Sequence, residues 1–315
     1  MNILSKYHYT LFIYIAAYIS LCSCSEKDTP VPEEPQNEPI QQKEELLRIE
    51  VPRQKEGSHN LFIVKKAKLR EDKDMMFVNF CMEYDQKKKS TRWTAFRWDM
   101  DNIYDSKCGR YGTYLSDPDV PKQYRVGSGY FQGYSRGHML ASEDRQCSAS
   151  ANMQTFYMTN MHPQFERFNG YDSKGDYVWL NAENLVRSLY QDWNVDDNAQ
   201  DTIYVVKGGT IDKQEHILGY TSNNNSSKII VPRYFYMAIL YRHSTPMTGD
   251  NWNAIALWIP HTEGDTTSGK DIAIKYAMSI DELEEKTNID FFHNLPDDIE
   301  ENVEQNYNPT SWNWR

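Results

Sequence analysis

Several common protein classes are excluded by what this 315-residue sequence lacks. It contains no internal repeat, which excludes solenoids and propellers. It has no glycine-rich loop of the Walker type, so it cannot cradle phosphates as a P-loop nucleotidase does. The mostly apolar run of residues 11–21 is shorter than the roughly 20 residues that a transmembrane helix needs. The chemistry of the protein therefore has to be sought in individual side chains.

Positive charge is also scarce, because the formal net charge is −11. Polyanion-binding proteins are usually basic. However, residues 26–50 carry a net charge of −5 and residues 281–304 a net charge of −9, so the remainder of the chain is slightly positive. The first expected strands carry a cluster of basic residues: Lys65, Lys66, Lys68, Lys87 to Lys89 and Arg92. This cluster would either bind along a phosphate backbone or protect a solvated strand edge. Charge alone does not exclude a nucleic-acid partner.

The N-terminus has the organisation of a bacterial export signal over residues 1–23. The sequence LCSC at 21–24 resembles a lipobox, in which Cys24 would be lipidated; a plain signal peptide with an incidental cysteine is the alternative. Residues 24–49 are rich in Pro, Glu and Gln, so we expect a disordered acidic tether. The acidic residues 25–28 resemble the sorting signal of surface-exposed lipoproteins. We expect a lipid-anchored protein of the cell envelope, in the outer membrane and exposed at the cell surface.

Three cysteines remain in the expected mature domain: Cys81, Cys108 and Cys147. A disulfide is permitted outside the inner membrane, and one between Cys108 and Cys147 would bracket the candidate catalytic strand. The alternative is three buried thiols, and the sequence leaves both open. A zinc site built from His138, His162 and Cys147 fits no common ligand spacing.

Residues 50–315 are sufficient for one elaborated domain. Alternating or apolar runs predict strands at 60–66, 76–83, 92–98, 130–131, 156–158 and 254–260, and two or three more over the runs 204–211 and 229–241. Helical patterns are fewer, at 151–157, 177–191 and 279–288, with Asp281 as the expected cap of the last helix. These elements predict an α+β fold, with a central, mostly antiparallel sheet and helices packed on it.

The stretch from 134 to 183 holds the side chains best suited to chemistry. His138 titrates near neutrality, so it can take a proton from water. Arg136 lies two residues earlier on an expected strand and projects from the same face, and its guanidinium suits phosphate oxygens. The amide oxygen of Asn169 is a hard, neutral ligand suited to hydrated magnesium. A base, a phosphate clamp and a hard metal ion together indicate phosphodiester hydrolysis.

The order of these residues resembles the DNA/RNA non-specific endonucleases, which are ββα-metal nucleases. The motifs that carry the resemblance are Arg136-Gly137-His138, TNMHPQ at 159–164, Asn169, and Trp179 with Glu183. Further likeness at 204–211, 230–240 and 279–292 extends it over about residues 50–303. The resemblance implies a ββα-metal core and a divalent metal ion, Mg²⁺ or also Mn²⁺.

The resemblance also implies a role for each residue of the motifs. His138 would be the general base, and Asn169 would be the direct protein ligand of the metal ion. Arg136 would lie against the phosphate, and Glu183 would hold a metal-bound water. Asn160 would order the site rather than bind the metal ion.

Arg110, which precedes the Asp117-Pro118 turn, is the candidate for the family's transition-state arginine. The sequence departs from the family at two places. Ser135 replaces the leading Asp of the family's motif, so a carboxylate beside the histidine is missing. Glu183 follows Asn169 at a longer spacing than in the family, with residues 172–177 as the apparent insertion, so we expect the helix proper to start near Tyr177.

These features predict a secreted, lipid-anchored, magnesium-dependent endonuclease. It would hydrolyse DNA and RNA with little sequence preference and leave 5′-phosphates, and we expect no protein partner. Two alternatives remain. One is a catalytically inactive surface-lipoprotein binding module on the same fold, of which Ser135 would be the symptom. The other is a phosphodiesterase of narrower substrate range.

Overall fold

The structure is a computed structural model that describes residues 43–71, 73–103, 108–170, 175–190, 201–221, 228–245, 249–312 and 314. The expected signal peptide, the Cys24 lipidation site and most of the expected tether lie outside the described residues. Residues 43–49 precede the expected domain boundary, and Leu46 and Ile49 pack against the core. None of the described helices is both long enough and apolar enough to span a bilayer.

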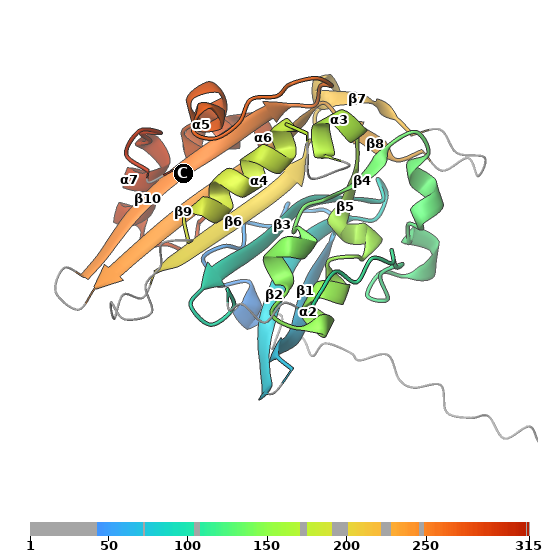
Figure 1. Cartoon of the computed structure of the whole chain (residues 1–315), viewed down its shortest axis with the longest axis horizontal. Coiled ribbons are helices and arrows are strands. Elements are labelled where there is room, and N and C mark those ends of the chain that lie inside the picture. The colour runs from blue at the N-terminus through green and yellow to red at the C-terminus, as the bar shows by residue number, and fades with distance from the viewer. Residues whose placement is uncertain are drawn as a thin grey trace, which may run out of the picture. The chain divides into compact units, whose positions relative to one another are not determined.

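A seven-stranded antiparallel sheet forms the centre of the fold (Figure 1). Its strands, in spatial order, are β1 (Leu61–Arg70), β2 (Lys73–Asp85), β3 (Ser90–Asp99), β6 (Thr202–Gly209), β9 (Tyr234–Thr245), β10 (Gly249–Pro260) and β11 (Ala277–Met278). The strands β9 and β10 pair along their whole lengths, from Thr245 opposite Gly249 to Tyr234 opposite Pro260. The predicted mostly antiparallel α+β fold is confirmed.

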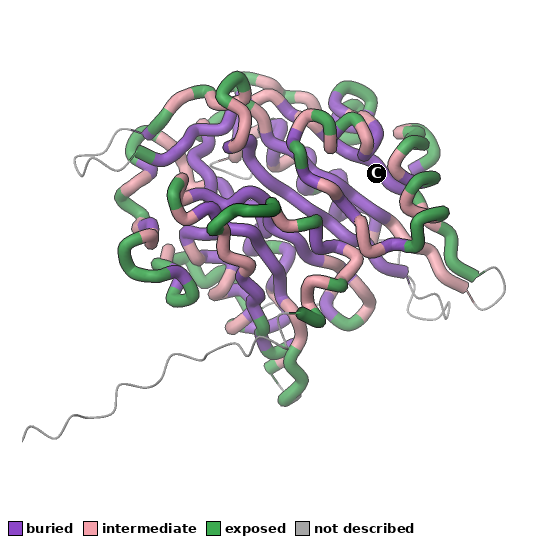
Figure 2. The backbone as a smooth tube through the Cα atoms, turned by 180° about the vertical axis from the view of Figure 1, so that it is seen from behind, coloured by how far each residue is buried: buried purple, intermediate pink, exposed green. Residues whose placement is uncertain are grey.

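Both faces of this sheet are buried, because apolar side chains alternate along its central strands. On β6, Ile203 and Val205 enter one core, while Tyr204 and Val206 enter the other. The buried stretches of the chain follow the central strands, whereas the exposed residues gather in loops and at element ends (Figure 2).

Different helices cover the two faces. The helices α4 (Val178–Ser188) and α5 (Asp271–Tyr276) contribute to the first core, and we call their side the α4 face (Figure 1). The helices α6 (Ile280–Thr287) and α7 (Asp297–Gln305) contribute to the second core, on the α6 face. The α6 helix is capped by Ser279, which forms a capping box with Glu282, so the expected cap Asp281 is wrong by two residues.

Short elements surround the sheet. They are β4 (Ser135–His138) with β5 (Met161–Gln164), β7 (Ile217–Tyr220) with β8 (Ile230–Pro232), the helices α2 (Ala149–Gln154) and α3 (Glu166–Asn169), and the 3-10 turns η1 (Lys122–Tyr124), η2 (Ser128–Phe131), η3 (Ser142–Arg145), η4 (Met158–Asn160) and η5 (Gln214–His216). Two strand predictions are corrected here, because residues 130–131 belong to η2 and residues 156–158 form no strand. The runs 204–211 and 229–241 give three strands, β6, β8 and β9, within the two or three expected.

Candidate active site

The hairpin of β4 and β5 carries the Arg136-Gly137-His138 motif. Gly137 lies opposite His162 in this hairpin, and a Cβ at Gly137 would lie 2.0 Å from Oε1 of Gln164. Only glycine therefore fits between the arginine and the histidine without moving Gln164. The hydroxyl of Ser135 donates to the carbonyl of Gln164 at 3.1 Å, so this residue closes the hairpin where the family has a carboxylate.

His138 ends β4 with 8% of its surface exposed. Its ring packs edge-on against Phe156, with the centroids 5.1 Å apart, and lies 6.2 Å from the ring of Tyr114. Burial, and then the charge of Arg110, lower the pKa of His138 to about 3, although the charge of Asp144 and a hydrogen bond with the Arg136 backbone oppose them. The Nε2 atom is buried without a hydrogen-bond partner in the described structure. This imidazole is neutral at physiological pH and can accept a proton.

Two guanidinium groups lie near His138, each over one of the two aromatic rings that pack beside the imidazole. The Cζ of Arg110 lies 4.9 Å from the centroid of Phe156, and the Cζ of Arg136 lies 4.8 Å from the centroid of Tyr114. Arg136 also donates to the carbonyl of Ser128, at 3.0 Å from its Nη2. The structure thus brings Arg110 to the same site as Arg136 and His138, although they are far apart in sequence. Such cations suit the oxygens of a phosphodiester.

Asn160 is fully buried and ties two segments of the site together. Its amide nitrogen donates to the carbonyls of Leu140 and Thr155, both at 2.9 Å. Its amide oxygen accepts from the backbone N–H of Leu140 at 3.0 Å. Two of these bonds hold Leu140, just after His138, and the third holds Thr155 at the end of α2, so Asn160 orders the backbone around the histidine.

Asn169 is the last residue of α3, and Gly170 follows it at φ 91°, which ends the helix. The neighbouring Phe168 stacks on Trp179 of α4, with the ring centroids 5.8 Å apart, so α3 packs against α4. The side-chain amide of Asn169 makes no hydrogen bond to the described residues. The helix α4 begins at Val178 with Tyr177 as its N-cap, as the spacing of the sequence predicted.

Glu183 lies on the buried side of α4, with 6% of its surface exposed. Its Oε1 accepts a hydrogen bond from Nζ of Lys207 at 3.0 Å, and its Oε2 lies 3.7 Å from Nη2 of Arg187. Burial raises the pKa of Glu183, and the charges of Lys207 and Arg187 oppose that effect. Glu183 is therefore part of a buried group of charges and is not on the solvated helix face that an isolated glutamate would favour.

The basic residues of the first strands form no continuous track. Lys65 is buried and pairs with Asp117 at 2.5 Å and with Asp119 at 2.6 Å. Arg92 is buried as well and pairs with Glu83 at 2.6 Å. Neither the phosphate-tracking nor the strand-edge interpretation therefore holds for these two residues. Others pair at the surface, including Lys66 with Glu45, Lys68 with Asp74 and Lys88 with Asp212.

The cysteines and the other histidine of the motif form no metal site. Cys81 and Cys147 are buried, whereas Cys108 is exposed, so the prediction of three buried thiols is wrong for Cys108. No disulfide is formed by the described cysteines. His162 is hydrogen-bonded to the carbonyl of Thr91 at 3.0 Å. Among the described residues, the one group of three potential metal ligands is Asp281, Glu284 and Glu304, which excludes the zinc alternative there.

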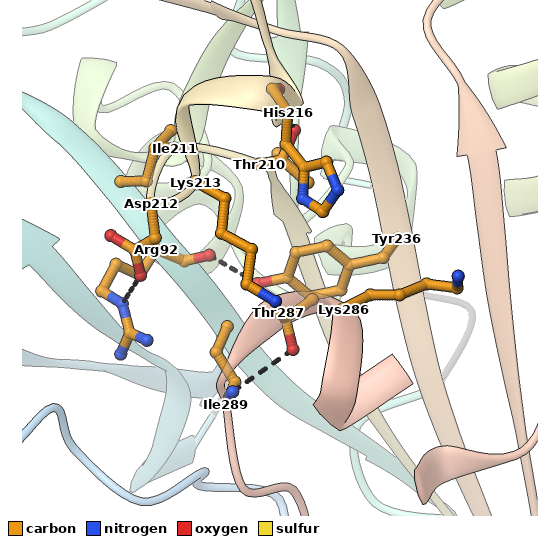
Figure 3. A pocket seen from close by; sticks show the side chains of 11 residues that line it. Arg92, Thr210, Ile211, Asp212, Lys213, His216, Tyr236, Lys286, Thr287 and Ile289 are labelled. Atoms are coloured by element: carbon orange, nitrogen blue, oxygen red, sulfur yellow. Dashed lines mark hydrogen bonds and ion pairs between the residues drawn. The ribbon is translucent and has the colours of Figure 1, made fainter. Parts of the chain in front are cut away.

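A pocket outside the motif lies between the end of β6 and the C-terminal part of α6 (Figure 3). Its walls include Lys213 and Lys286, together with Tyr236 of the α6 face. Lys213 extends across the pocket, and its Nζ donates to the carbonyl of Glu285 at 2.6 Å. Nε of Arg92 forms an ion pair with Oδ2 of Asp212 at 2.7 Å. The pocket is on the opposite face from Trp179 and Phe168, so we do not include it in the candidate active site.

A profile of the DNA/RNA non-specific endonuclease family matches residues 59–298. The chain belongs to this family. The family resemblance of the sequence is confirmed, and the family supports a non-specific nuclease that acts on DNA and RNA. Nucleases of the ββα-metal type use a divalent metal ion.

Individual relatives agree with this assignment. A nuclease of Nostoc sp. is 27% identical over 76% of this chain and 80% of its own length. Nuclease C1 of Cunninghamella echinulata is 26% identical over 69% of this chain and 81% of its own. The human mitochondrial nuclease EXOG is 25% identical over 70% of this chain, which spans 56% of that protein. The solved EndoG/EndoGI complex matches with a TM-score of 0.54 and 17% identity, over 70% of this chain and 85% of that one, and it shows the shared fold.

The partners of Glu183 were not predicted from the sequence. Lys207 lies on β6, Arg187 one helical turn after Glu183, and Asp144 in η3. One signal was available, because Lys207 is a lysine within the otherwise uncharged run YVVKGGTI. A charged residue in a strand buried on both faces requires a buried partner. The identity of that partner is not readable from the sequence.

Proposed function

We propose that this nuclease hydrolyses phosphodiesters with His138 as its general base and with Mg²⁺ as its metal ion. The observation that carries the proposal is the buried, neutral imidazole, whose Nε2 lacks a described partner while Arg110 and Arg136 flank its aromatic neighbours. A base of this kind must be unprotonated and must face the position of the attacking water. Guanidinium groups beside it bind the phosphate and stabilise its growing negative charge.

The residues at the site fit a hard divalent ion. Asn169 would supply an amide oxygen that no described residue occupies, and Glu183 would supply a hydrogen-bond acceptor for a water of the ion. Soft thiolate ligands are absent from these positions, which favours Mg²⁺ or Mn²⁺ over zinc. Such an ion neutralises charge on the phosphate when bound.

The chain's own residues would act in one displacement step. Nε2 of His138 takes a proton from water as the water oxygen bonds to phosphorus, and the bond from phosphorus to the 3′ oxygen breaks. The 3′ oxygen leaves and takes a proton from solvent, and His138 returns its proton to solvent. The products are a 3′-hydroxyl and a 5′-phosphate, as the family resemblance implies. Recognition through phosphate alone explains low sequence preference.

The location of the protein is a separate proposal that rests on its N-terminal sequence. We infer that residues 1–23 direct export and that Cys24 carries lipid, which would anchor the nuclease in the outer membrane at the cell surface. The support is the lipobox-like sequence at 21–24 and the acidic residues that follow it. Metabolic labelling with a fatty acid tests it: label is expected on the wild-type chain, and label that persists in Cys24→Ala would refute lipidation at this residue.

One gel tests the catalytic proposal. The full chain is incubated with supercoiled plasmid and with RNA, in Mg²⁺ and in EDTA, beside His138→Ala. We expect cleavage of both substrates, abolished by EDTA and reduced about a hundredfold or more by the substitution. Intact substrates across pH, salt and divalent ions, together with retained binding, would establish the inactive binding module instead. Cleavage of small phosphodiesters but not of polymers would establish the narrower enzyme.

A further inference from the structure

The fully buried Lys207 is the unusual feature of the candidate active site. It lies on β6, on the α4 face with Ile203 and Val205, and none of its side chain is exposed. Its Nζ lies 5.6 Å from the ring centroid of Phe96 and 5.8 Å from that of Trp179. Burying an ammonium costs several kcal/mol unless strong partners offset it, and an apolar residue would fill the same space at lower cost. The reason for a lysine at this position has to be sought in the charged groups that contact its ammonium.

Those partners belong to a buried group of four charges, and the exposed Glu143 lies at its edge, 3.9 Å from Nη1 of Arg187. Nζ of Lys207 lies 3.0 Å from Oε1 of Glu183 and 3.8 Å from Oδ2 of Asp144. Nε of Arg187 lies 2.5 Å from Oδ1 of Asp144. The two cations and two carboxylates balance. Arg145 is buried nearby, but its guanidinium donates to backbone carbonyls, including those of Asn79 and Arg97.

The two oxygens of Glu183 are placed differently by this group. Oε1 is held by Lys207 at hydrogen-bonding distance. Oε2 lies 3.7 Å from Arg187, which is beyond a hydrogen bond, and it accepts no hydrogen bond from the described residues. One oxygen is therefore fixed and neutralised, while the other keeps its acceptor capacity. A carboxylate in this state suits a polarised water better than it suits direct bonding to a cation.

We propose that Lys207 is a positioning residue of the nuclease site, which fixes Oε1 of Glu183 and neutralises its charge, so that Glu183 acts on a metal-bound water and not as a direct ligand of the ion. This inference rests on the proposed function. It gives the buried ammonium a role that an apolar side chain could not fill. It also predicts that the effects of Lys207 on ion binding and on turnover have opposite signs.

The experiment compares the full-length wild type with Lys207→Met, Lys207→Arg and Glu183→Gln. Calorimetry measures the binding of Mn²⁺ without substrate, and plasmid cleavage gives kcat and KM. Lys65→Met is the matched control, because it removes another buried lysine that pairs with two carboxylates away from Glu183. Denaturant unfolding of each variant identifies any that fail to fold.

Lys207→Met leaves one negative charge unbalanced near the ion. We expect about tenfold tighter Mn²⁺ binding, because the carboxylate of Glu183 then attracts the ion without an opposing ammonium, and charges interact strongly in a buried site. We expect kcat to fall about tenfold or more, with KM within about threefold, since the substrate contacts are retained. Lys207→Arg should keep ion affinity near the wild type and recover most of kcat. Lys65→Met should leave ion affinity unchanged whatever its stability.

The combination of Lys207→Met with Glu183→Gln completes the test. A positioning role predicts that the double variant is no slower than Glu183→Gln alone, because the ammonium then has no carboxylate to hold. Unchanged or weaker Mn²⁺ binding in folded Lys207→Met, wild-type turnover, or multiplicative losses would each overturn the proposal. A wild-type protein that neither binds Mn²⁺ nor cleaves would overturn the proposed function itself, which is a distinguishable result.

Discussion

Replacing His138 by leucine should remove about 2 kcal/mol from the change in unfolding free energy between pH 7 and pH 5. The reason is the burial that keeps this histidine neutral in the folded protein. In the unfolded chain its pKa is about 6.5. In the folded protein, burial and the charge of Arg110 lower it to about 3. Between these values the unfolded state binds a proton that the folded state does not.

The sign follows from that difference in proton binding. Stability is lost as the pH falls below about 6.5 and continues to fall toward the folded-state pKa of about 3. Each unit of pH within this window costs about 1.4 kcal/mol, and protonation of the unfolded chain is partial near pH 6.5. From pH 7 to pH 5 the contribution of His138 is therefore about 2 kcal/mol, a large part of a typical domain's stability.

Urea unfolding followed by circular dichroism, at pH 7 and at pH 5, measures this contribution. His162 and His261 are also buried, and burial lowers the pKa of each to about 4, so they steepen the acid loss in both proteins. Their contributions cancel when the two pH-dependent differences are compared. An equal difference in the wild type and in His138→Leu would refute the view that His138 is buried and neutral in the folded protein.

Substitutions at Gly137, Asn160 and Arg110, with Gln164→Ala as a compensating change, test the construction of the site. Gly137→Ala should lower the unfolding free energy by about 1–3 kcal/mol, as its Cβ would lie 2.0 Å from Oε1 of Gln164, and Gln164→Ala should recover most of that loss in denaturant titrations. Asn160→Ala should cost about 3 kcal/mol in thermal unfolding, because three buried backbone groups lose their partners. Arg110→Ala should lower kcat and move the acid limb of the pH profile upward, because the charge of Arg110 lowers the pKa of His138; an unmoved limb would contradict that coupling.

The central sheet could be predicted because its signal is local. Alternating apolar residues along β6, β9 and β10 face two cores, and each strand shows that pattern without reference to its neighbours. The 3-10 turn at 128–131 was mistaken for a strand, because a short aromatic pair has the same composition in both. The cap of α6 was misplaced for a similar reason, since serine and aspartate both cap helices and only backbone geometry selects Ser279.

The residues of the sequence motif could be named in advance, whereas the residues that surround them in the fold could not. The motif residues His138, Asn160 and Glu183 could be named because the resemblance fixes their order. The rings of Tyr114 and Phe156 lie between the two arginines and the histidine, and they come from a loop and from the turn after α2. Neither the helical pattern at 151–157 nor the strand expected at 156–158 indicated that Phe156 would contact His138. The two segments are joined by backbone hydrogen bonds of Leu115 with Phe156 and Met158, a long-range pairing that no local pattern predicts.

The acidic composition of the chain is compatible with a polyanionic substrate because the charges are separated in space. Much of the excess negative charge belongs to residues 281–304, which include α6 and α7. These helices pack on the α6 face, whereas α4 and its motif residues pack on the α4 face. Helices on opposite faces of a sheet lie farther apart than the Debye length of about 8 Å at physiological ionic strength, so solvent ions largely screen them from each other. Under the proposed function, a phosphate would approach the guanidinium groups of Arg110 and Arg136, so the local charge at the site would matter more than the net charge of the chain.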